Sequence, residues 1–243
     1  MKKLVTLSFI ILLAIPCNAQ WGKRVKGNGN VVTIERSTGD YDAVAVSGWF
    51  DVDLIAGNEG EITLTGEENL LEYIKTEVKN GKLVVKVEKG VNLRPSSWNK
   101  DKAIVITVPV ETVNSVTLSG SGDIVGKTVL KADNFHTNIS GSGDISLEIA
   151  AKSVSASMSG SGDINLMGKT NDFDVQVSGS GDIKAYDLES EFVNAQVSGS
   201  ADIRVTANQS LKARVSGSGD ISYRGNPKKV DSKTSGSGDI SKG

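Results

Sequence analysis

The sequence is poor in cysteine, and this scarcity excludes several kinds of site. Its one cysteine, Cys17, precedes Ala19, after which the pattern of small residues predicts signal-peptide cleavage. A mature chain that begins at Gln20 has no disulfide, no thiol nucleophile and no cysteine ligand for zinc. Such a protein must be held together by packing and backbone hydrogen bonds.

The sequence also has no net positive charge and only one histidine. The formal net charge is −2, so the chain lacks the basic surface that binding of nucleic acid requires. Its only histidine, His136, is expected to point outward and is not at the spacing of a Ser-His-Asp triad. No phosphate-binding loop or Cys/His metal motif is present. The sequence therefore predicts a protein that is not an enzyme, with no catalytic residues, no cofactor and no nucleic-acid partner.

Long apolar runs are confined to the N-terminus. Positively charged MKK precedes LVTLSFIILLAI, which is too short to span a membrane and is typical of an export signal. The signal predicts export to the periplasm, the outer cell surface or the medium. Two alternatives stay open: an uncleaved anchor, and lipid attachment at Cys17, although Pro16 stands where a lipoprotein signal has a small residue.

Glycine, by contrast, is abundant and concentrated in one hexapeptide. SGSGDI occurs at 119–124, 140–145, 159–164, 178–183, 216–221 and 235–240, with the variant SGSADI at 198–203. Successive copies are 18 to 21 residues apart, and apolar and polar residues alternate on both sides of each copy, as in two half-buried strands. This spacing favours an all-β fold, a single-chain β-solenoid (parallel β-helix) with coils of about 19 residues, over a meander of hairpins.

The hexapeptide is expected to form a corner of each coil. The alternation places Ser159, Ser161 and Asp163 outside and Gly160 and Gly162 inside. A corner leaves no room for an inward side chain, which explains glycine at both positions. Because coils stack at about 4.8 Å, equivalent positions form columns along the solenoid.

The remaining segments are less regular. AVAVSGWFDVDL at 43–54 aligns with the repeat and is interpreted as a degenerate first coil, with Trp49-Phe50 in place of Ser-Gly. The expected further strands are EITLTG, GKLVVKVEKG and AIVITVPV. EENLLEYIKTEV at 67–78 is the one helix candidate, and VNLRPSSWNKDK is a loop; both are expected to cap the N-terminal end of the stack. Trp49 and Phe50 either fill that end or form an exposed aromatic patch.

The chain is therefore divided as follows. We expect a signal peptide over 1–19, an N-terminal segment over 20–37, an irregular solenoid part over 38–112, regular coils over 113–223, and a Lys-rich C-terminal coil or cap over 224–243.

The order of these motifs is itself informative. An export signal is followed by VSGWFDVDL, EENLLEYIKTEVKNGKLVVKV and AIVITVP, and then by the SGSGD repeats. In this the sequence resembles the putative auto-transporter adhesin, head GIN domain family, over roughly residues 38–223. The resemblance implies a β-solenoid exported to the cell envelope, and it implies neither catalytic residues nor a defined ligand.

Two polar columns supply the candidate binding residues. One comprises Asp123, Asp144, Asp163, Asp182, Asp202, Asp220 and Asp239, and the other includes Ser140, Ser159 and Ser178. Unit charges about 4.8 Å apart repel by roughly 0.9 kcal/mol in water, so the carboxylates need compensation. Either N–H groups of the same turn and a nearby serine hydroxyl supply it, or a row of Ca²⁺ ions does. The motif GSGD is one residue shorter than its counterpart in the calcium nonapeptide.

These features predict a non-catalytic envelope protein that acts through its surface. It is expected to be an adhesin, a binder of envelope polysaccharide or of a surface protein, or a structural component. The alternative is a carbohydrate-active enzyme, a polysaccharide lyase or hydrolase on a β-helix scaffold, which needs an acid pair unique to one place on the stack.

Overall fold

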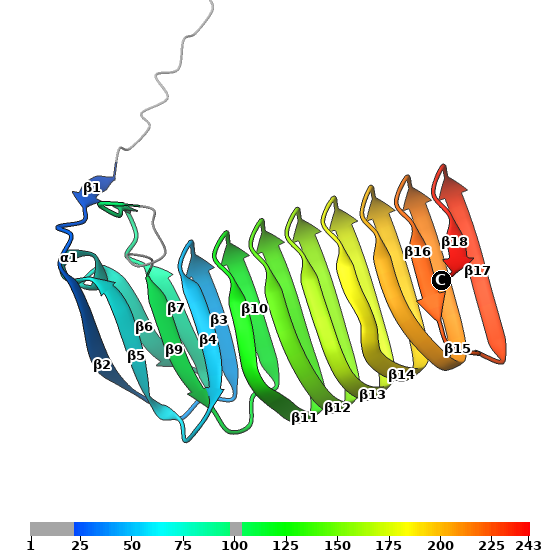
Figure 1. Ribbon diagram of the computed structural model, residues 1–243, viewed down its shortest axis with the longest axis horizontal. Helices are drawn as coiled ribbons and strands as arrows, with labels where there is room; N and C mark the ends of the chain where they lie inside the picture. Colours follow the sequence, from blue (N-terminus) through cyan, green and yellow to red (C-terminus); the bar gives the residue numbers. More distant parts are fainter. Residues whose placement is uncertain (1–21, 98–103) are drawn as a thin grey trace, which may run out of the picture.

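A row of stacked coils, broadened at its N-terminal end, makes up the structure (Figure 1). The computed structural model describes residues 22–97 and 104–243; the expected signal peptide, Trp21 and Trp98 lie outside the described residues. The strands are β1 (Lys23–Lys26), β2 (Val31–Gly39), β3 (Ala43–Gly48), β4 (Asp51–Ala56), β5 (Gly60–Glu67), β6 (Ile74–Lys79), β7 (Lys82–Val87), β8 (Val91–Arg94), β9 (Val105–Val110), β10 (Ser115–Gly120), β11 (Ile124–Gly141), β12 (Ile145–Gly160), β13 (Ile164–Gly179), β14 (Ile183–Gly199), β15 (Ile203–Gly217), β16 (Ile221–Arg224), β17 (Lys229–Gly236) and β18 (Ile240–Lys242), and the helix is α1 (Glu68–Leu71).

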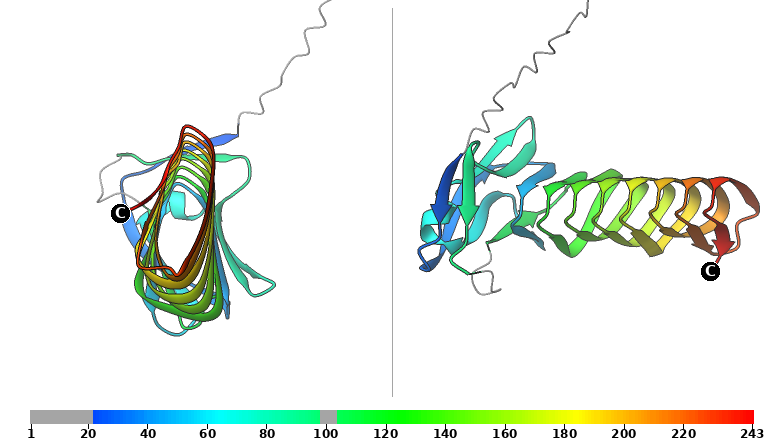
Figure 2. Two further views of the ribbon diagram at one scale, coloured as in Figure 1. Left: turned by 90° about the vertical axis from the view of Figure 1, so that its right-hand side faces the viewer. Right: turned by 90° about the horizontal axis from the view of Figure 1, so that it is seen from above.

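The expected β-solenoid is confirmed. From β10 onward every strand pairs in parallel with its neighbours, and hexapeptides meet in register, so that Ser140 lies opposite Ser159 and Gly141 opposite Gly160. Viewed end-on, the coils lie behind one another with a flattened outline (Figure 2). In β11 to β15 the two expected strands of a period form one long bent strand, whereas in the last period β16 and β17 stay separate. The bend coincides with bulges and with residues such as Gly168, at a φ of 112°, so the backbone stays hydrogen-bonded around it.

At the corner, outward polar residues alternate with glycines as expected. The requirement for glycine has a more specific cause than a general lack of space. Gly160 has a φ of 154°, and a Cβ on it would collide with the carbonyl oxygen of Gly141 in the preceding coil. A Cβ on Gly162 would collide in the same way with the carbonyl oxygen of Gly143. Glycine is therefore required because the backbones of successive corners touch one another.

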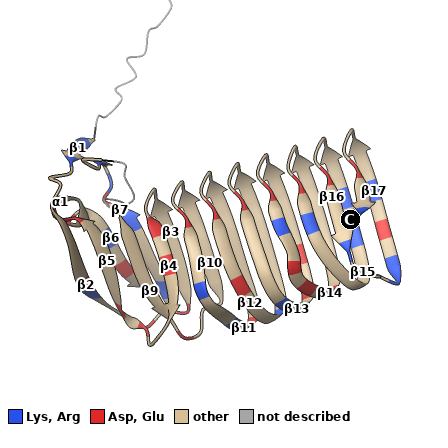
Figure 3. Ribbon diagram, in the orientation of Figure 1, with Lys and Arg blue, Asp and Glu red and all other residues tan. Residues whose placement is uncertain are grey.

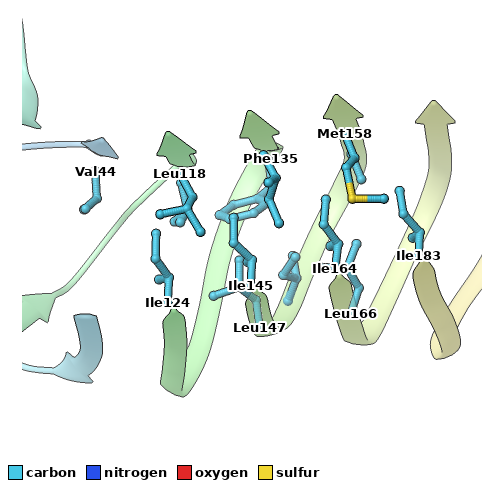
Figure 4. Packing of buried hydrophobic residues seen from close by; sticks show 14 of the residues in the cluster. Val44, Leu118, Ile124, Phe135, Ile145, Leu147, Met158, Ile164, Leu166 and Ile183 are labelled. Carbon is cyan, nitrogen blue, oxygen red and sulfur yellow. The ribbon is translucent and has the colours of Figure 1, made fainter. Parts of the chain in front are cut away.

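The core consists of two facing sets of aliphatic columns (Figure 4). Ile124, Ile145, Ile164 and Ile183 follow one another in register, as do Leu118, Ile139, Met158 and Val177, and all are at most 3% exposed. Each such side chain contributes about 1.5–3 kcal/mol by leaving water. The stack is thus stabilised without disulfides.

The degenerate first coil is also confirmed. β3 pairs with β10 and β4 with β11, which places Ser47 opposite Ser119 and Val52 opposite Ile124. Phe50 is 1% exposed and fills the end of the stack, whereas Trp49 is only half-buried. Phe50 therefore takes the first of the two expected roles, whereas Trp49 lies at the surface without being fully exposed.

The helix predicted over 67–78 is wrong over most of its length. α1 covers only Glu68–Leu71, and Ile74–Lys79 form β6, antiparallel to β7. Apolar residues four apart fit one face of a helix and also one face of a strand. The β-branched residues Ile74, Thr76 and Val78 occupy every second position of β6, which pairs along its length with β7. Such residues favour strands.

The expected loop at the N-terminal end also begins as a strand. β8 takes its first residues and pairs in parallel with β1. The cap that helix and loop were expected to form is built mainly of strands, because β7 pairs with β3 and β9 with β4. The first coil therefore has hydrogen-bonded neighbours on both sides.

Strand β17 of the C-terminal coil is exposed along its whole length. In β17, Ser232 and Thr234 take inward positions that Ala213 and Val215 occupy one coil earlier. Among the described residues, no helix is long and apolar enough to cross a membrane.

Candidate functional site

The aspartate column is hydrogen-bonded between coils. In Figure 3, acidic positions recur at the upper corners of successive coils. The Oδ1 atom of each aspartate accepts the N–H of the aspartate one coil further on, at 2.7–3.1 Å; the donor–acceptor pairs are Asp123–Asp51, Asp144–Asp123, Asp163–Asp144, Asp182–Asp163, Asp202–Asp182, Asp220–Asp202 and Asp239–Asp220. The expected acceptance from the same turn is thus wrong, and Asp51 extends the column by one member.

The environment changes along the column. Burial opposes ionisation of Asp163, but the Lys184 ammonium, 2.6 Å from Oδ2, and the N–H of Asp182 outweigh it and lower the pKa of this carboxyl. Burial raises the pKa of Asp51, and the carboxylate of Asp123 adds to the rise. Lys184, which received no role from the sequence, relieves the repulsion at mid-stack.

The calcium hypothesis receives no support from the geometry of the column. Within residues 22–97 and 104–243, no three carboxylate, imidazole or thiol groups converge on a common point. Calcium takes six to eight oxygen ligands. Binding of Ca²⁺ along the column stays a prediction for solution experiments.

The serine column lies at the edge of a broader polar face. We define the polar face as the outward side chains of the strand segments 134–140, 153–159, 172–178, 192–198, 210–216 and 229–235. Its other members form columns beside the serines, the nearest being Asn138, Ser157, Gln176, Gln196, Arg214 and Lys233. Ser140, Ser159 and Ser178 are exposed, and an open hollow of about 520 Å³ runs along this part of the face past Ser159 and Ser178.

One aromatic residue on the polar face was missed from the sequence. Phe192 occupies the position of Ser153, Asp172 and Ser210 in neighbouring coils, and it is 50% exposed. A second hollow, of about 300 Å³, lies against it on the same face and is also lined by Asp174, Asn194 and Lys212. The signal was present, because alternation in EFVNAQV places Phe192 on the same side as Asn194 and Gln196.

A separate cavity of about 880 Å³ lies at the N-terminal end. Its described walls are partly apolar and partly basic, with Arg24, Lys26, Trp49, Val87, Val91, Asn92, Leu93, Arg94 and Pro95. Trp49 thus lines a concave surface instead of forming a flat exposed patch.

The carboxylates of the aspartate column do not supply an acid pair that is unique to one coil. They repeat the same contact in each coil. In the described part of the chain Glu67 is the one buried carboxylate, and it accepts the backbone N–H groups of Gly29 and Ser96. His136 is exposed, as expected.

Comparison with known proteins is consistent with this architecture. Residues 40–227 match the family described as "Putative auto-transporter adhesin, head GIN domain". No curated protein sequence matches the chain.

Three solved structures have a similar fold. A putative adhesin from Bacteroides fragilis NCTC 9343 superposes with a TM-score of 0.84 at 23% identity, covering 90% of this chain and 99% of that one. A putative adhesin from Parabacteroides merdae ATCC 43184 gives 0.72 at 24%, covering 91% and 99%. A putative lipid binding protein from Parabacteroides distasonis ATCC 8503 gives 0.73 at 28%, covering 91% and 100%.

Proposed function

Because the chain belongs to the putative auto-transporter adhesin, head GIN domain family, we propose that it is an exported, non-catalytic envelope protein that binds its partner through the polar face. The observation that carries the proposal is the continuous hollow along the serine column and its amide-bearing neighbours. By contrast, the aspartate carboxylates each use one oxygen to accept a backbone N–H of the next coil. We therefore assign binding to the serine side of the corner and a structural role to the aspartate side.

Capture of envelope material tests this assignment. Immobilised mature protein is expected to retain components of an envelope extract, and a Gln176→Ala/Gln196→Ala variant is expected to retain at least tenfold less. The matched control is Ser146→Ala/Asn165→Ala, because Asn165 donates to Ser146 on the opposite face. Circular dichroism verifies that all variants fold. Equal retention by the two double variants, or no retention by the parent protein, contradicts the proposal.

The enzymatic alternative makes a different prediction. A polysaccharide lyase or hydrolase needs two acids in one place with separate roles. We expect no new reducing ends or unsaturated products when the mature protein is incubated with common polysaccharides. Turnover that disappears on substitution of a single carboxylate would restore the enzymatic function.

A second candidate function is binding of an anionic lipid in the N-terminal cavity. Arg24, Lys26 and Arg94 surround apolar walls that include Trp49 and Val87. A structural relative at 28% identity is named a putative lipid binding protein. Flotation with phosphatidylglycerol vesicles is expected to recruit the parent protein and not an Arg24→Gln/Lys26→Gln variant; equal flotation of both excludes this function.

A further inference from the structure

One exposed aromatic ring interrupts the columns of the polar face. The large apolar side chains that are exposed in the described residues are Val31, Val129, Phe192 and Val230. Phe192 is the one aromatic among them, and it stands between Asp172 and Ser210 of the adjacent coils. Half of the ring contributes nothing to the core, so its position on this face needs another explanation.

Hydrogen-bonding groups beside the ring are held in place by one another. Asp174 accepts the Asn194 Nδ2 amide at 2.7 Å on one carboxylate oxygen and the Gln176 Nε2 amide at 3.3 Å on the other. Lys212 follows Asn194 in the same column and lines the same hollow. These contacts fix the side-chain orientations before any ligand arrives, which lowers the entropy cost of binding.

The charges next to the ring nearly cancel, because two carboxylates and one ammonium line the hollow and leave a single negative charge. Asp172 and Asp174 face Lys212, and Arg214 is paired with Asp231 at 2.6 Å. A strongly acidic or basic ligand therefore meets no complementary field here. A protein partner is also disfavoured, because a stable interface buries about 800 Å² per side around several apolar anchors and this face offers one ring.

We infer that the face around Phe192 binds a neutral polysaccharide chain. The aromatic ring suits the C–H face of one pyranose, and Asp174 and Gln176 suit the hydroxyl or acetamido groups at its edge, while the Asn194 amide holds Asp174 in place. The same kinds of polar group recur one coil further, at about 4.8 Å, which is comparable with the length of one sugar residue. The polysaccharide then lies across the coils, parallel to the columns, with Gln196 and Arg214 on the side nearer the serines. This inference rests on the proposed function and names the ligand class of that face.

Affinity electrophoresis tests the inference directly. Native gels contain hydroxyethylcellulose, xylan, galactomannan or glycol chitin as neutral probes, and polygalacturonate as the acidic probe. At least one neutral polymer is expected to retard the parent protein, with Phe192→Ala weakening the affinity tenfold or more. Phe192→Tyr is expected to bind like the parent, and so is Val129→Ala, which trims an exposed apolar side chain outside the polar face. The inference is overturned if no neutral polymer retards the parent or if Phe192→Ala binds equally well.

Treatment of the envelope extract separates this inference from the proposed function. Periodate destroys sugar diols and is expected to abolish capture, whereas proteinase K is expected to leave it intact. Capture that survives periodate and is lost with proteinase K overturns the inference and leaves the proposed function standing. An untreated extract that yields no capture contradicts the proposed function itself.

Discussion

The aspartates of the corner are identical in sequence and differ in what they contact. An interior carboxylate accepts the N–H of the next coil, whereas Asp239 belongs to the last coil of the chain. Asp163 has Lys184 as an additional partner, and Asp51 is the half-buried N-terminal end of the column. A residue's contribution therefore depends on its place along the stack.

Alanine substitutions measure this dependence. Asp163→Ala leaves the N–H of Asp182 without its acceptor and is expected to cost about 1–3 kcal/mol of unfolding free energy. Relief of repulsion, roughly 0.9 kcal/mol per neighbour in water, offsets part of this and shrinks with added salt. Asp239→Ala is expected to cost under about 0.5 kcal/mol. Urea denaturation at low and high salt provides the measurement. Asp144→Ala is the control, because it removes the same kind of inter-coil hydrogen bond without removing the ion pair of Asp163 with Lys184. A stabilised Asp163→Ala variant would show that the column serves something other than stacking.

Acidification is expected to protonate Asp51 and Asp163 in a fixed order. The folded pKa of Asp51 lies above the ordinary value of 3.8, so as pH falls Asp51 binds its proton first and the cost of ionising it disappears. The folded pKa of Asp163 lies below 3.8, so its stabilising contribution is complete above about pH 4 and is lost as pH falls through that lower value. Carboxyl ¹³C NMR titration measures both. Lys184→Met should raise the pKa of Asp163, and an unchanged value there, or the reverse order of titration, contradicts this assignment.

At the scale of elements, the coil is the repeating unit of both structure and energy. β12 and β13 pair residue by residue from Ile145–Ile164 to Gly160–Gly179, and successive core columns continue through them. Each coil touches its two neighbours, as in other solenoids. Removal of one complete circuit should therefore leave all columns in register.

Deletion of residues 164–182, a complete period from Ile164 to Asp182, is expected to give a folded, shorter solenoid. At about 0.05–0.15 kcal/mol per residue, the loss of unfolding free energy is about 1–3 kcal/mol. Deletion of residues 164–173 removes half a circuit, moves the corner to the wrong side of the stack and is expected to prevent folding. Thermal melts followed by circular dichroism compare the two; similar melts would mean that the corners do not set the register.

At the scale of the whole molecule, the two ends of the stack are protected in different ways. Strands β7 and β9 cover the N-terminal end. At the C-terminal end the last coil carries Ser232 and Thr234 at inward positions and Lys229 and Lys233 outside, which is how terminal repeats and sheet edges avoid association.

Truncation after Arg224 should reverse this protection. It uncovers Leu211, Ala213 and Val215, which are at most 3% exposed in the full chain. The truncated protein is expected to elute as larger species in size-exclusion chromatography at concentrations at which the full chain does not. The same truncation with Ala213→Ser and Val215→Thr added should elute closer to the full chain. Identical elution of truncated and full chains would assign no protective role to the last coil.

Calcium provides a test on the whole stack. If the inter-coil N–H groups satisfy the aspartates, millimolar Ca²⁺ and EDTA should give melting temperatures within a few degrees of each other. If Ca²⁺ bound the column, a Ca²⁺ concentration a hundred times its Kd would raise the free energy of unfolding by about 2.7 kcal/mol. A large shift that EDTA reverses would establish the metal column instead.

The repeat and its alternation determined the solenoid, the corner and the degenerate first coil, because each follows from local spacing that recurs in every period. The contacts between coils were decided by tertiary structure alone. The partner of the Asp144 carboxylate is an N–H 19 residues away in the chain but adjacent in the stack. Residues 74–79 form a strand because they hydrogen-bond to β7, and the apolar spacing alone did not distinguish a strand from a helix. Likewise, the alternation placed Phe192 outside, but its exposure and its neighbours Asp172 and Ser210 depend on the register of three coils.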